Sequence, residues 1–502
     1  MAGRGNAACP QRVMRKLLPC PPYATLKPWQ ERDIRKILKL FERGQKGVLL
    51  ATAMGLGKTA EAIVAANAWA RQGSPYRILV IAPKSALSDW RTNLRRFDVH
   101  HLPVVRIKSN TQWSPATLPP RCWLITNYET LAKQPGLRTH LWDLLIVDES
   151  QMTKEPTAQR TRLIYGGDGA GAGMLFRNCI LLSGTPLKGR VEELFEQLHF
   201  LDPERWRRWG DFVADYYARG YEVDTRRWRV VQNEYAIPVN LLELHHLLDR
   251  TVMVRTNKED PIVRTEKSNP LLPKQYELKM VSEVGEELNA MLRLKARLAE
   301  KVGKQLAKAR RDGDQAAVEE LQARLDGLMA EIRHLTAVGK VQAVIDYLLT
   351  LREKTVIIAY HKSSMFYKII RALRQAGRGV VCHSGDDESP GAAIEAFQTD
   401  PEVQFFAGQE LTSRNSLTLT ASHHVVMAEI PQVWGDFDQA SDRVHRLTQE
   451  AQVLTTVVAL NHWAGADLDI LDKLQRERFV AEQVLDGRAE ARDWNWLSEE
   501  QI

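Results

Sequence analysis

The chain has 502 residues, too many for one hydrophobic core and suited to two or three domains. Its composition, 44% hydrophobic and 26% charged, is that of an ordinary globular protein, and no apolar run is long enough to span a bilayer. We therefore expect no membrane partner, whereas the net charge of +7 is compatible with a polyanionic one.

Cysteine spacing argues against a zinc module or a disulfide framework, because no C-x-x-C pair occurs among Cys9, Cys20, Cys122, Cys179 and Cys382. A reducing compartment fits this usage best, so we expect a cytoplasmic protein, bacterial or phage-encoded, or a nuclear one if it is eukaryotic. Residues 1–22 are basic and contain no acidic residue, which predicts a disordered lead. A mitochondrial-type leader is the alternative.

The first predicted element is a helix over Glu31–Phe41, entered through Leu26–Gln30. The side-chain amide of Gln30 carries both the donor and the acceptor that an adenine edge requires. An exposed polar residue at a helix start is the simpler interpretation. Gln30 is therefore a candidate nucleotide contact only if a phosphate site follows.

A phosphate loop is indicated by Val48–Thr59, where a buried strand runs into a glycine turn and Lys-Thr opens a helix. Gly55 and Gly57 let backbone N–H groups converge on an anion, and the helix N-terminus adds its positive dipole. Lys58 would reach the β- and γ-phosphates of ATP, and the Thr59 hydroxyl would ligate Mg²⁺. The cradle also includes Met54 and Leu56. The strict pattern G-x-x-x-x-G-K-[ST] fails at its first position, Thr52.

A parallel sheet is predicted by short apolar runs that alternate with helical or loop stretches. The predicted strands of this first lobe are Ile78–Ala82, Val104–Ile107, Trp123–Thr126, Leu144–Asp148 and Cys179–Ser183. With the phosphate loop they form an ATP-binding lobe over 23–255.

Two carboxylates end the fourth of these strands, at the sheet edge where ligands bind in open α/β folds. Asp148 is placed to hold Mg²⁺, and Glu149 to orient or deprotonate the attacking water. A solvated turn is the alternative, but the upstream Gly-Lys-Thr loop favours catalysis. Ser183, Gly184 and Thr185 end the next strand, either as a plain turn or as a relay toward a nucleic-acid track.

Helical insertions are predicted between two lobes. Residues 204–245 contain an aromatic and basic segment, which suits either nucleic-acid stacking or, as we favour, a helical protrusion packed on its parent lobe. Residues 256–281 hold three prolines and are predicted to connect the lobes. Residues 282–337 carry two apolar stripes broken at 311–314, which predicts an antiparallel helical hairpin. Its charges could grip a duplex or a partner, although a solvated face is the default.

A second α/β lobe is predicted over 338–487, followed by a tail over 488–502. Its strands are expected at Thr355–Ala359, Val380–Cys382, Val403–Ala407, Val425–Ala428 and Leu454–Leu460. Two such lobes imply a cleft with ATP at their boundary. Arg443 and Arg446, at i and i+3 on one predicted helical face, would supply permanent charge to the transferring phosphoryl group. Surface arginines are the alternative.

The order of these motifs resembles that of Swi/Snf-type helicase-like ATPases of helicase superfamily two. The strings that carry the resemblance are MGLGKT (54–59), IAPKSALSDW (81–90), ITNYE (125–129), VDES (147–150), LLSGTPLKGRVEELFEQLHFLDP (181–203), VMVRTNKED (252–260), LPKQ (272–275), TVIIAYHKSS (355–364) and QASDRVHRLTQ (439–449). Asp-Glu-Ser and MAEIPQVW (427–434) are most similar to the annealing-helicase branch. The resemblance covers residues 24–487.

The resemblance implies two RecA-like lobes with helical insertions that close on Mg·ATP, with Arg443 and Arg446 as arginine fingers. It implies coupling across the cleft through Gln151, Ser183, Gly184, Thr185 and Gln439. It also implies a nucleic-acid track in the first lobe, formed by Pro83, Lys84, Thr126, Asn127 and Tyr128.

Four departures separate this chain from the family pattern. Thr52 and Ala53 replace an acidic pair, and Gln151 replaces a histidine. Arg414 and Ser416 replace glycines of a G-x-G-L-x-L loop, and Thr448 replaces another glycine. Because those glycines either adopt positive φ or lie close to phosphate, the changes in 408–419 put ATP-coupled motion in more doubt than ATP binding.

The expected function is a DNA-dependent ATPase that translocates on duplex or forked DNA and remodels it without the usual strand separation. Contact should be made with phosphates and be salt-sensitive. An ATP-gated nucleic-acid binding module with weak hydrolysis and an RNA-directed unwinding enzyme are the alternatives.

Overall fold

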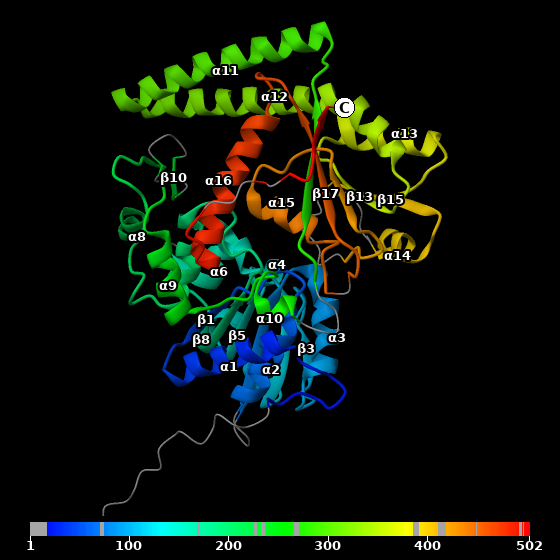
Figure 1. The fold of residues 1–502 in the computed structure, drawn as a ribbon. Helices are drawn as coiled ribbons and strands as arrows, with labels where there is room; N and C mark the ends of the chain where they lie inside the picture. Colours follow the sequence, from blue (N-terminus) through cyan, green and yellow to red (C-terminus); the bar gives the residue numbers. More distant parts are fainter. Residues whose placement is uncertain are drawn as a thin grey trace, which may run out of the picture.

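The computed structural model describes residues 18–70, 75–167, 171–224, 228–231, 236–265, 271–384, 391–409, 418–447, 449–490, 494 and 496–501. Within them the chain forms two parallel seven-stranded sheets flanked by helices, as predicted. Figure 1 shows the first lobe below, the second above it, and a long helical hairpin across the top. The altered loop at 413–416 and Thr448 lie outside the described residues.

The first sheet has the order β11-β1-β8-β5-β2-β4-β3, with every pair parallel. Its strands are β1 (Gly47–Leu50), β2 (Tyr76–Ala82), β3 (Val104–Arg106), β4 (Arg121–Asn127), β5 (Leu141–Asp148), β8 (Leu175–Leu182) and β11 (Met253–Val254). Because successive side chains of a strand face opposite sides, Val48 and Leu50 belong to one apolar cluster and Leu49 to the other. Both faces are thus buried, which explains the nearly continuous apolar runs.

Helices cover both faces of this sheet. They are α1 (Pro28–Glu42), α2 (Lys58–Trp69), α3 (Leu87–Phe97), α4 (Tyr128–Leu131), α5 (Gly136–Thr139), α6 (Gln159–Tyr165), α7 (Phe195–Leu201), α8 (Trp209–Tyr216), α9 (Leu241–Thr251) and α10 (Pro261–Arg264), with short 3₁₀ turns η2 (Lys84–Ala86), η3 (Pro115–Thr117), η4 (Ser150–Thr153) and η5 (Val191–Leu194). The apolar residues Ile34, Ile63 and Leu94 of α1, α2 and α3 pack together on one face.

The second sheet has the order β14-β15-β13-β16-β17-β12-β18, again with every pair parallel. Its strands are β12 (Gln275–Val281), β13 (Thr355–Ile358), β14 (Gly379–His383), β15 (Val403–Gly408), β16 (His424–Met427), β17 (Leu454–Leu460) and β18 (Glu499–Gln501). Its helices are the π-helical turn η6 (Lys362–Phe366), α13 (Tyr367–Gln375), α14 (Gly391–Thr399), α15 (Trp434–Ser441) and α16 (Asp467–Asp486).

The second lobe is larger than predicted. The expected interlobe connection contains β12, which pairs with β17, and the expected tail contains β18, which pairs with β12. Strand β12 was not predicted from the sequence, because Glu277 and Lys279 interrupt its apolar pattern. These two charges form an ion pair with each other, 2.9 Å apart.

The hairpin consists of α11 (Glu286–Asp312) and α12 (Gln315–Thr350), as the two stripes predicted. Gly313 ends α11 with a φ of 71°, a left-handed conformation that glycine adopts without strain. Helix α12 does not stop at residue 337 but continues into the second lobe, where Val344 and Leu348 are buried.

The protrusion at 204–245 contains less helix than predicted. Its described residues hold α8, the first residues of α9 and a small antiparallel pair, β9 (Val223–Asp224) and β10 (Arg229–Val230). The aromatic side chains of Trp206, Phe212 and Tyr216 are buried in an apolar cluster that extends from the first lobe into the second. Packing, rather than nucleic-acid stacking, therefore accounts for these aromatic residues.

No helix in the described part of the chain is both long enough and apolar enough to cross a membrane.

Candidate ATP site between the two lobes

The phosphate loop joins β1 to α2, and its two glycines adopt the conformation that motivated the prediction. Gly55 has a φ of 82° and Gly57 a φ of 99°, both in the left-handed region. Gly57 is the N-cap of α2, so Lys58 and Thr59 begin the helix and their backbone N–H groups are free of intrahelical partners. The loop therefore provides the anion-binding helix N-terminus that a phosphate cradle needs.

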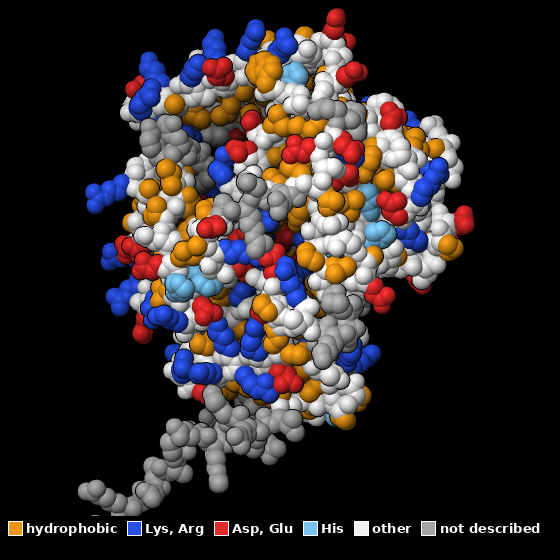
Figure 2. All heavy atoms as spheres, in the orientation of Figure 1, with side chains coloured by type: hydrophobic (Ala, Val, Ile, Leu, Met, Phe, Trp, Pro, Cys, Tyr) orange, Lys and Arg blue, Asp and Glu red, His pale blue; other side chains and the backbone are white. Residues whose placement is uncertain are grey.

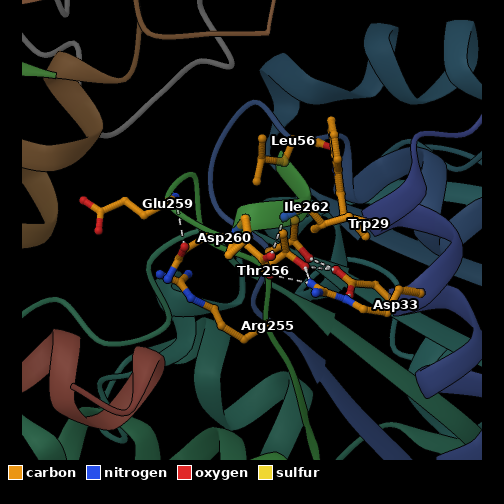
Figure 3. Close-up of polar contacts among 12 residues, drawn as sticks. Trp29, Asp33, Leu56, Arg255, Thr256, Glu259, Asp260 and Ile262 are labelled. Carbon is orange, nitrogen blue, oxygen red and sulfur yellow. Dashed lines mark hydrogen bonds and ion pairs between the residues drawn. The ribbon is translucent and has the colours of Figure 1, made fainter. Parts of the chain in front are cut away.

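The α1 helix supports this loop from beneath. The indole Nε1 of Trp29 and the amide Nε2 of Gln30 both donate to the carbonyl oxygen of Leu56, at 3.1 and 3.0 Å (Figure 3). The Oε1 atom of Gln30 accepts from the backbone N–H of Lys27 at 2.9 Å. The amide of Gln30 is thus occupied in holding the loop, and its contact with adenine stays a prediction. Trp29 was missed, because a lone tryptophan carries no sequence signal for loop support.

Thr52 lies between two buried carboxylates, Asp33 and Glu61, which the sequence analysis did not single out. Its hydroxyl oxygen is 3.2 Å from Asp33 Oδ2 and 3.1 Å from Glu61 Oε2. Burial and the neighbouring Asp33 raise the pKa of Glu61 well above its ordinary value. The acidic residue usual at position 52 would add a third carboxylate here, so threonine is the residue that these surroundings favour.

Asp33 also anchors the segment that leaves the first lobe. Thr256 donates its hydroxyl to Asp33 Oδ2 at 2.5 Å and accepts from Arg32 at 2.6 Å (Figure 3). Arg32 reaches Asp260 at 2.8 Å. Through this network α1 fixes the chain immediately before the second lobe.

The acidic pair lies at the carboxyl end of β5, as predicted. Asp148 Oδ2 accepts from the indole of Trp90 at 2.8 Å, and Oδ1 accepts from the backbone N–H of Glu149 at 3.0 Å. Burial and the charge of Glu149 raise the pKa of Asp148 to about 7. A nearby cation would favour the ionised form, and Lys58 already acts in that direction.

Glu149 begins a continuous chain of hydrogen bonds that crosses the cleft between the lobes. Gln151 donates from Nε2 to Glu149 Oε2 and accepts at Oε1 from the Ser183 hydroxyl, both at 2.5 Å. Ser183 Oγ accepts from the backbone N–H of Thr185 at 3.1 Å. Gln439, in α15 of the second lobe, donates to Thr185 Oγ1 at 2.7 Å. The five side chains form what we call the cleft relay.

Gly184 has no room for a side chain. A Cβ atom there would lie 2.5 Å from Met54 Cγ and 3.2 Å from Lys58 Nζ. The absence of a side chain therefore lets the relay segment pack directly against the phosphate loop.

Arg446 of the second lobe lies against the phosphate loop, and Arg443 lies near Arg446 and Glu149, but neither arginine belongs to a helix. Helix α15 ends at Ser441, so the prediction that Arg443 and Arg446 share a helical face is wrong. The chain turns after α15, because His445 is held by the connection to the first lobe. A Cβ atom on Gly55 would lie 2.7 Å from Arg446 Cδ, so this glycine leaves space for the arginine.

Three cationic side chains, Lys58, Arg443 and Arg446, lie near the acidic pair. Burial and the neighbouring Arg446 lower the pKa of Arg443 to about 10, while Glu149 opposes the change. Burial also lowers the pKa of Lys58, against the charges of Glu149 and Asp148. The three cations disfavour one another's charge in this buried cleft, and a bound polyanion would relieve that repulsion.

A buried ion cluster joins the arginine segment to the interlobe connection. Asp442 Oδ1 lies 2.8 Å from both Lys258 Nζ and Lys274 Nζ. His445 contacts the carbonyl oxygen of Leu272 at 2.7 Å through Nε2, and Lys258 donates to the carbonyl oxygen of His445 at 2.7 Å. Burial alone would raise the pKa of Asp442, but Lys258 and Lys274 bring it well below its ordinary value.

We expect Asp442→Asn to lower the free energy of unfolding by about 3 kcal/mol, because it leaves two buried lysines without their shared carboxylate. The pKa of Asp442 is depressed in the folded state, so its contribution is present above its unfolded pKa of about 3.9 and is lost only at lower pH. Denaturant unfolding should show the same loss at about pH 5 and pH 7. Asp438→Asn is the matched control, because Asp438 also pairs with Lys274 but is more exposed. Equal losses for both variants would contradict the assignment.

The predicted nucleic-acid track is only partly accessible. Lys84 is exposed and Pro83 and Asn127 are half-buried, whereas Thr126 and Tyr128 are buried. Thr126 donates its hydroxyl to the carbonyl oxygen of Ile107 at 3.1 Å, and Tyr128 donates to the carbonyl oxygen of Asp148 at 2.5 Å. The side chains of Thr126 and Tyr128 thus position backbone, and Tyr128 fixes the turn that carries the acidic pair.

Comparison with known proteins agrees with this arrangement. A model of the SNF2-related domain matches residues 29–308. The chain is 27% identical over 486 residues to the Bos taurus protein described as DNA annealing helicase and endonuclease ZRANB3, covering 94% of this chain and 42% of that protein. It is 29% identical over 417 residues to the Xenopus tropicalis SWI/SNF-related matrix-associated actin-dependent regulator of chromatin subfamily A-like protein 1, covering 81% of this chain and 40% of that one.

The chain thus spans about two fifths of the length of these relatives. Among solved structures, the Sulfolobus solfataricus SWI2/SNF2 ATPase core in complex with dsDNA matches with a TM-score of 0.43 and 20% identity, covering 94% of this chain and 95% of that one. The family model covers more than half of the chain and contains the phosphate loop, the acidic pair and the relay residues of the first lobe. The chain belongs to the SNF2-related family, as its motifs predicted.

Proposed function

We propose that this protein is a DNA-dependent ATPase that translocates on double-stranded DNA and remodels duplex or forked DNA. The observation that carries the proposal is the contact of Arg446, from the second lobe, with Gly55 of the phosphate loop. An ATP site completed by a second lobe can couple hydrolysis to movement of one lobe against the other. Membership of the SNF2-related family supports the same conclusion.

The roles follow from the chemistry of each side chain. The backbone amides at Gly55–Thr59 and the Lys58 ammonium would bind the β- and γ-phosphates. Glu149 would orient the attacking water and accept its proton, and Arg443 and Arg446 would neutralise charge that develops on the γ-phosphoryl oxygens. Guanidinium suits this task, because it stays charged and forks onto phosphate oxygens.

Thr59 and Asp148 would hold Mg²⁺, which supplies Lewis-acid stabilisation of the phosphate oxygens when it is bound. The fit is supported by the position of Asp148, which is buried beside Glu149 at the end of β5: burial and the Glu149 charge raise its pKa, and a bound cation would favour its ionised form. Within the described residues no cluster of three His, Cys, Asp or Glu side chains could form an all-protein metal cage. One carboxylate and one hydroxyl suit an ion that also binds nucleotide phosphates.

The cleft relay would couple nucleic-acid binding to the position of Glu149, the carboxylate that would activate water. We expect Gln439→Ala to lower the DNA-stimulated rate of ATP hydrolysis by about three- to tenfold, the equivalent of one hydrogen bond. Nucleotide affinity should be unchanged, because Gln439 contacts Thr185 and not the phosphate loop. Phosphate release at saturating DNA measures the effect. Gln432→Ala, at an exposed position of the same lobe, is the control; an equal loss there would argue against the relay.

Displacement of a third strand from a triplex tests translocation directly. We expect ATP-dependent displacement from duplex DNA, without separation of the duplex strands, that weakens as salt rises because contact is made with phosphates. ATP-dependent separation of an RNA duplex would instead identify an unwinding enzyme. ATP binding that changes DNA affinity without displacing the third strand would identify an ATP-gated binding module.

A further inference from the structure

The exposed face of α11 carries a stripe of six cationic side chains. They recur every three or four residues at Arg293, Arg297, Lys301, Lys304, Lys308 and Arg311, and all six are exposed. At roughly 100° per residue they fall within an arc of about 80° on one side of the helix. Figure 2 shows Lys and Arg side chains along the upper edge of the molecule, where α11 lies in Figure 1. We call these six residues the α11 stripe.

The stripe lies on the face of α11 that turns away from the hairpin partner. The opposite face buries Leu292, Ala299, Val302, Leu306 and Ala309. Met291 and Leu294, two apolar residues beside Arg293, are 43% and 57% exposed. The outer surface of the helix therefore packs against no other element of the described chain, so packing does not account for its cationic residues.

Charge along the hairpin is divided by sign. Residues 288–311 contain eight Lys or Arg and one acidic residue, Glu300, whereas residues 315–331 of α12 contain four acidic residues and one Arg. A face that serves only solubility mixes both signs. Among the described residues, the only ion pair formed by the stripe is Lys304 with Glu300, 2.6 Å apart and exposed. The positive charge of the stripe is thus almost uncompensated.

The dimensions of the stripe match those of a nucleic-acid duplex. The eighteen helical steps from Arg293 to Arg311 span about 27 Å at 1.5 Å per residue. A B-form duplex presents about eight base pairs over that length, with two phosphates per pair. The hollows that border the row, beside Arg293 and Arg297 and beside Arg311, contain, among the described residues, no aromatic side chain on which a base could stack. A row of cations of this kind suits the phosphate backbone and not base readout.

The stripe lies far from the first-lobe track. In Figure 1 the hairpin lies above the second lobe, and its tip reaches the first-lobe protrusion, where Arg310 lies 3.9 Å from Glu222. Lys84, by contrast, follows strand β2 in the first-lobe sheet. We propose that the α11 stripe binds the phosphate backbone of a second DNA duplex segment, distinct from the one at the first-lobe track. The inference takes its partner class from the proposed function, but it concerns binding and not hydrolysis.

The test is the salt dependence of binding to forked DNA, measured without nucleotide. The variant is the triple substitution Arg297→Gln, Lys301→Gln and Lys308→Gln, three stripe residues that form no ion pair within the described part of the chain. Each lost phosphate contact should reduce the slope of log K against log salt by about 0.9, so the slope should fall by about 2.7. A titration with a short duplex should give two duplexes per unmodified protein and one per variant.

Two control variants test whether a reduced slope comes from the stripe itself or from the loss of positive charge anywhere on the protein. Arg297→Lys, Lys301→Arg and Lys308→Arg together keep the charge and should keep the slope. Arg35→Gln, Lys39→Gln and Arg43→Gln together remove three exposed cations with similar spacing from α1 and its C-cap, at the other end of the molecule, and should also keep the slope.

An unchanged slope for the stripe variant would overturn the proposal, as would a single duplex per unmodified protein. Binding to anionic lipid vesicles in place of duplex would assign the stripe to a membrane surface, and the proposal would be wrong. Because neither measurement involves ATP, a failure of hydrolysis would count against the proposed function alone.

Discussion

Replacing Arg446 with alanine is expected to lower the DNA-stimulated rate of ATP hydrolysis by about a thousandfold, the effect typical of a lost arginine finger. The reason is geometric: Arg446 of the second lobe lies against Gly55 of the loop that would bind the phosphates of ATP. ATP affinity should change much less, because the phosphate loop and Lys58 belong to the first lobe. Steady-state phosphate release and direct nucleotide binding measure the two quantities.

Two further variants make this prediction specific. Arg446→Lys keeps the charge but loses the planar fork, so it should restore only part of the rate. Arg476→Ala removes an exposed arginine of α16 that pairs with Asp472 and should leave the rate unchanged. An Arg446→Ala variant that hydrolyses ATP normally would exclude a site shared between the lobes.

Glu149→Gln should lower turnover by between about a hundredfold and ten-thousandfold while ATP binding is preserved. A glutamine keeps an oxygen that can accept from Gln151, so the cleft relay persists, but it cannot accept a proton from water. The positive φ of Glu149, 54°, holds the residue in an uncommon conformation at the turn after β5. Rapid-quench measurement of a single turnover isolates the chemical step.

Glu129→Gln is the control for this prediction, because Glu129 is an exposed carboxylate of α4 in the same lobe. It should turn over as the unmodified protein does. Normal turnover by Glu149→Gln would mean that another group activates the water.

The sequence alone predicted those parts of the site that depend on local pattern. The glycine loop, Lys58 and the acidic pair each follow a buried strand, so their place at the carboxyl edge of the sheet follows from sheet geometry. The two apolar stripes at 282–337 also predicted the two helices of the hairpin. The cross-cleft pair of Thr185 and Gln439 was suggested by family resemblance, and the structure brings the two side chains together.

Residues that act through distant contacts could not be predicted. Trp29 supports the phosphate loop from 27 positions away, and Asp33 reaches Thr256 from 223 positions away. The helical placement of Arg443 and Arg446 was wrong, because tertiary contacts of Asp442 and His445 end α15 early. Strand β12 was missed since its charged residues are satisfied only in the folded sheet.

Phosphate release with and without duplex DNA, at saturating ATP and low salt, tests the central claim most directly. The account predicts strong stimulation by the duplex that fades as salt rises, with Lys58→Ala giving the background rate. ATP binding without any stimulation by duplex DNA would contradict it, and would show that the two lobes form a nucleotide site that does not drive a DNA motor.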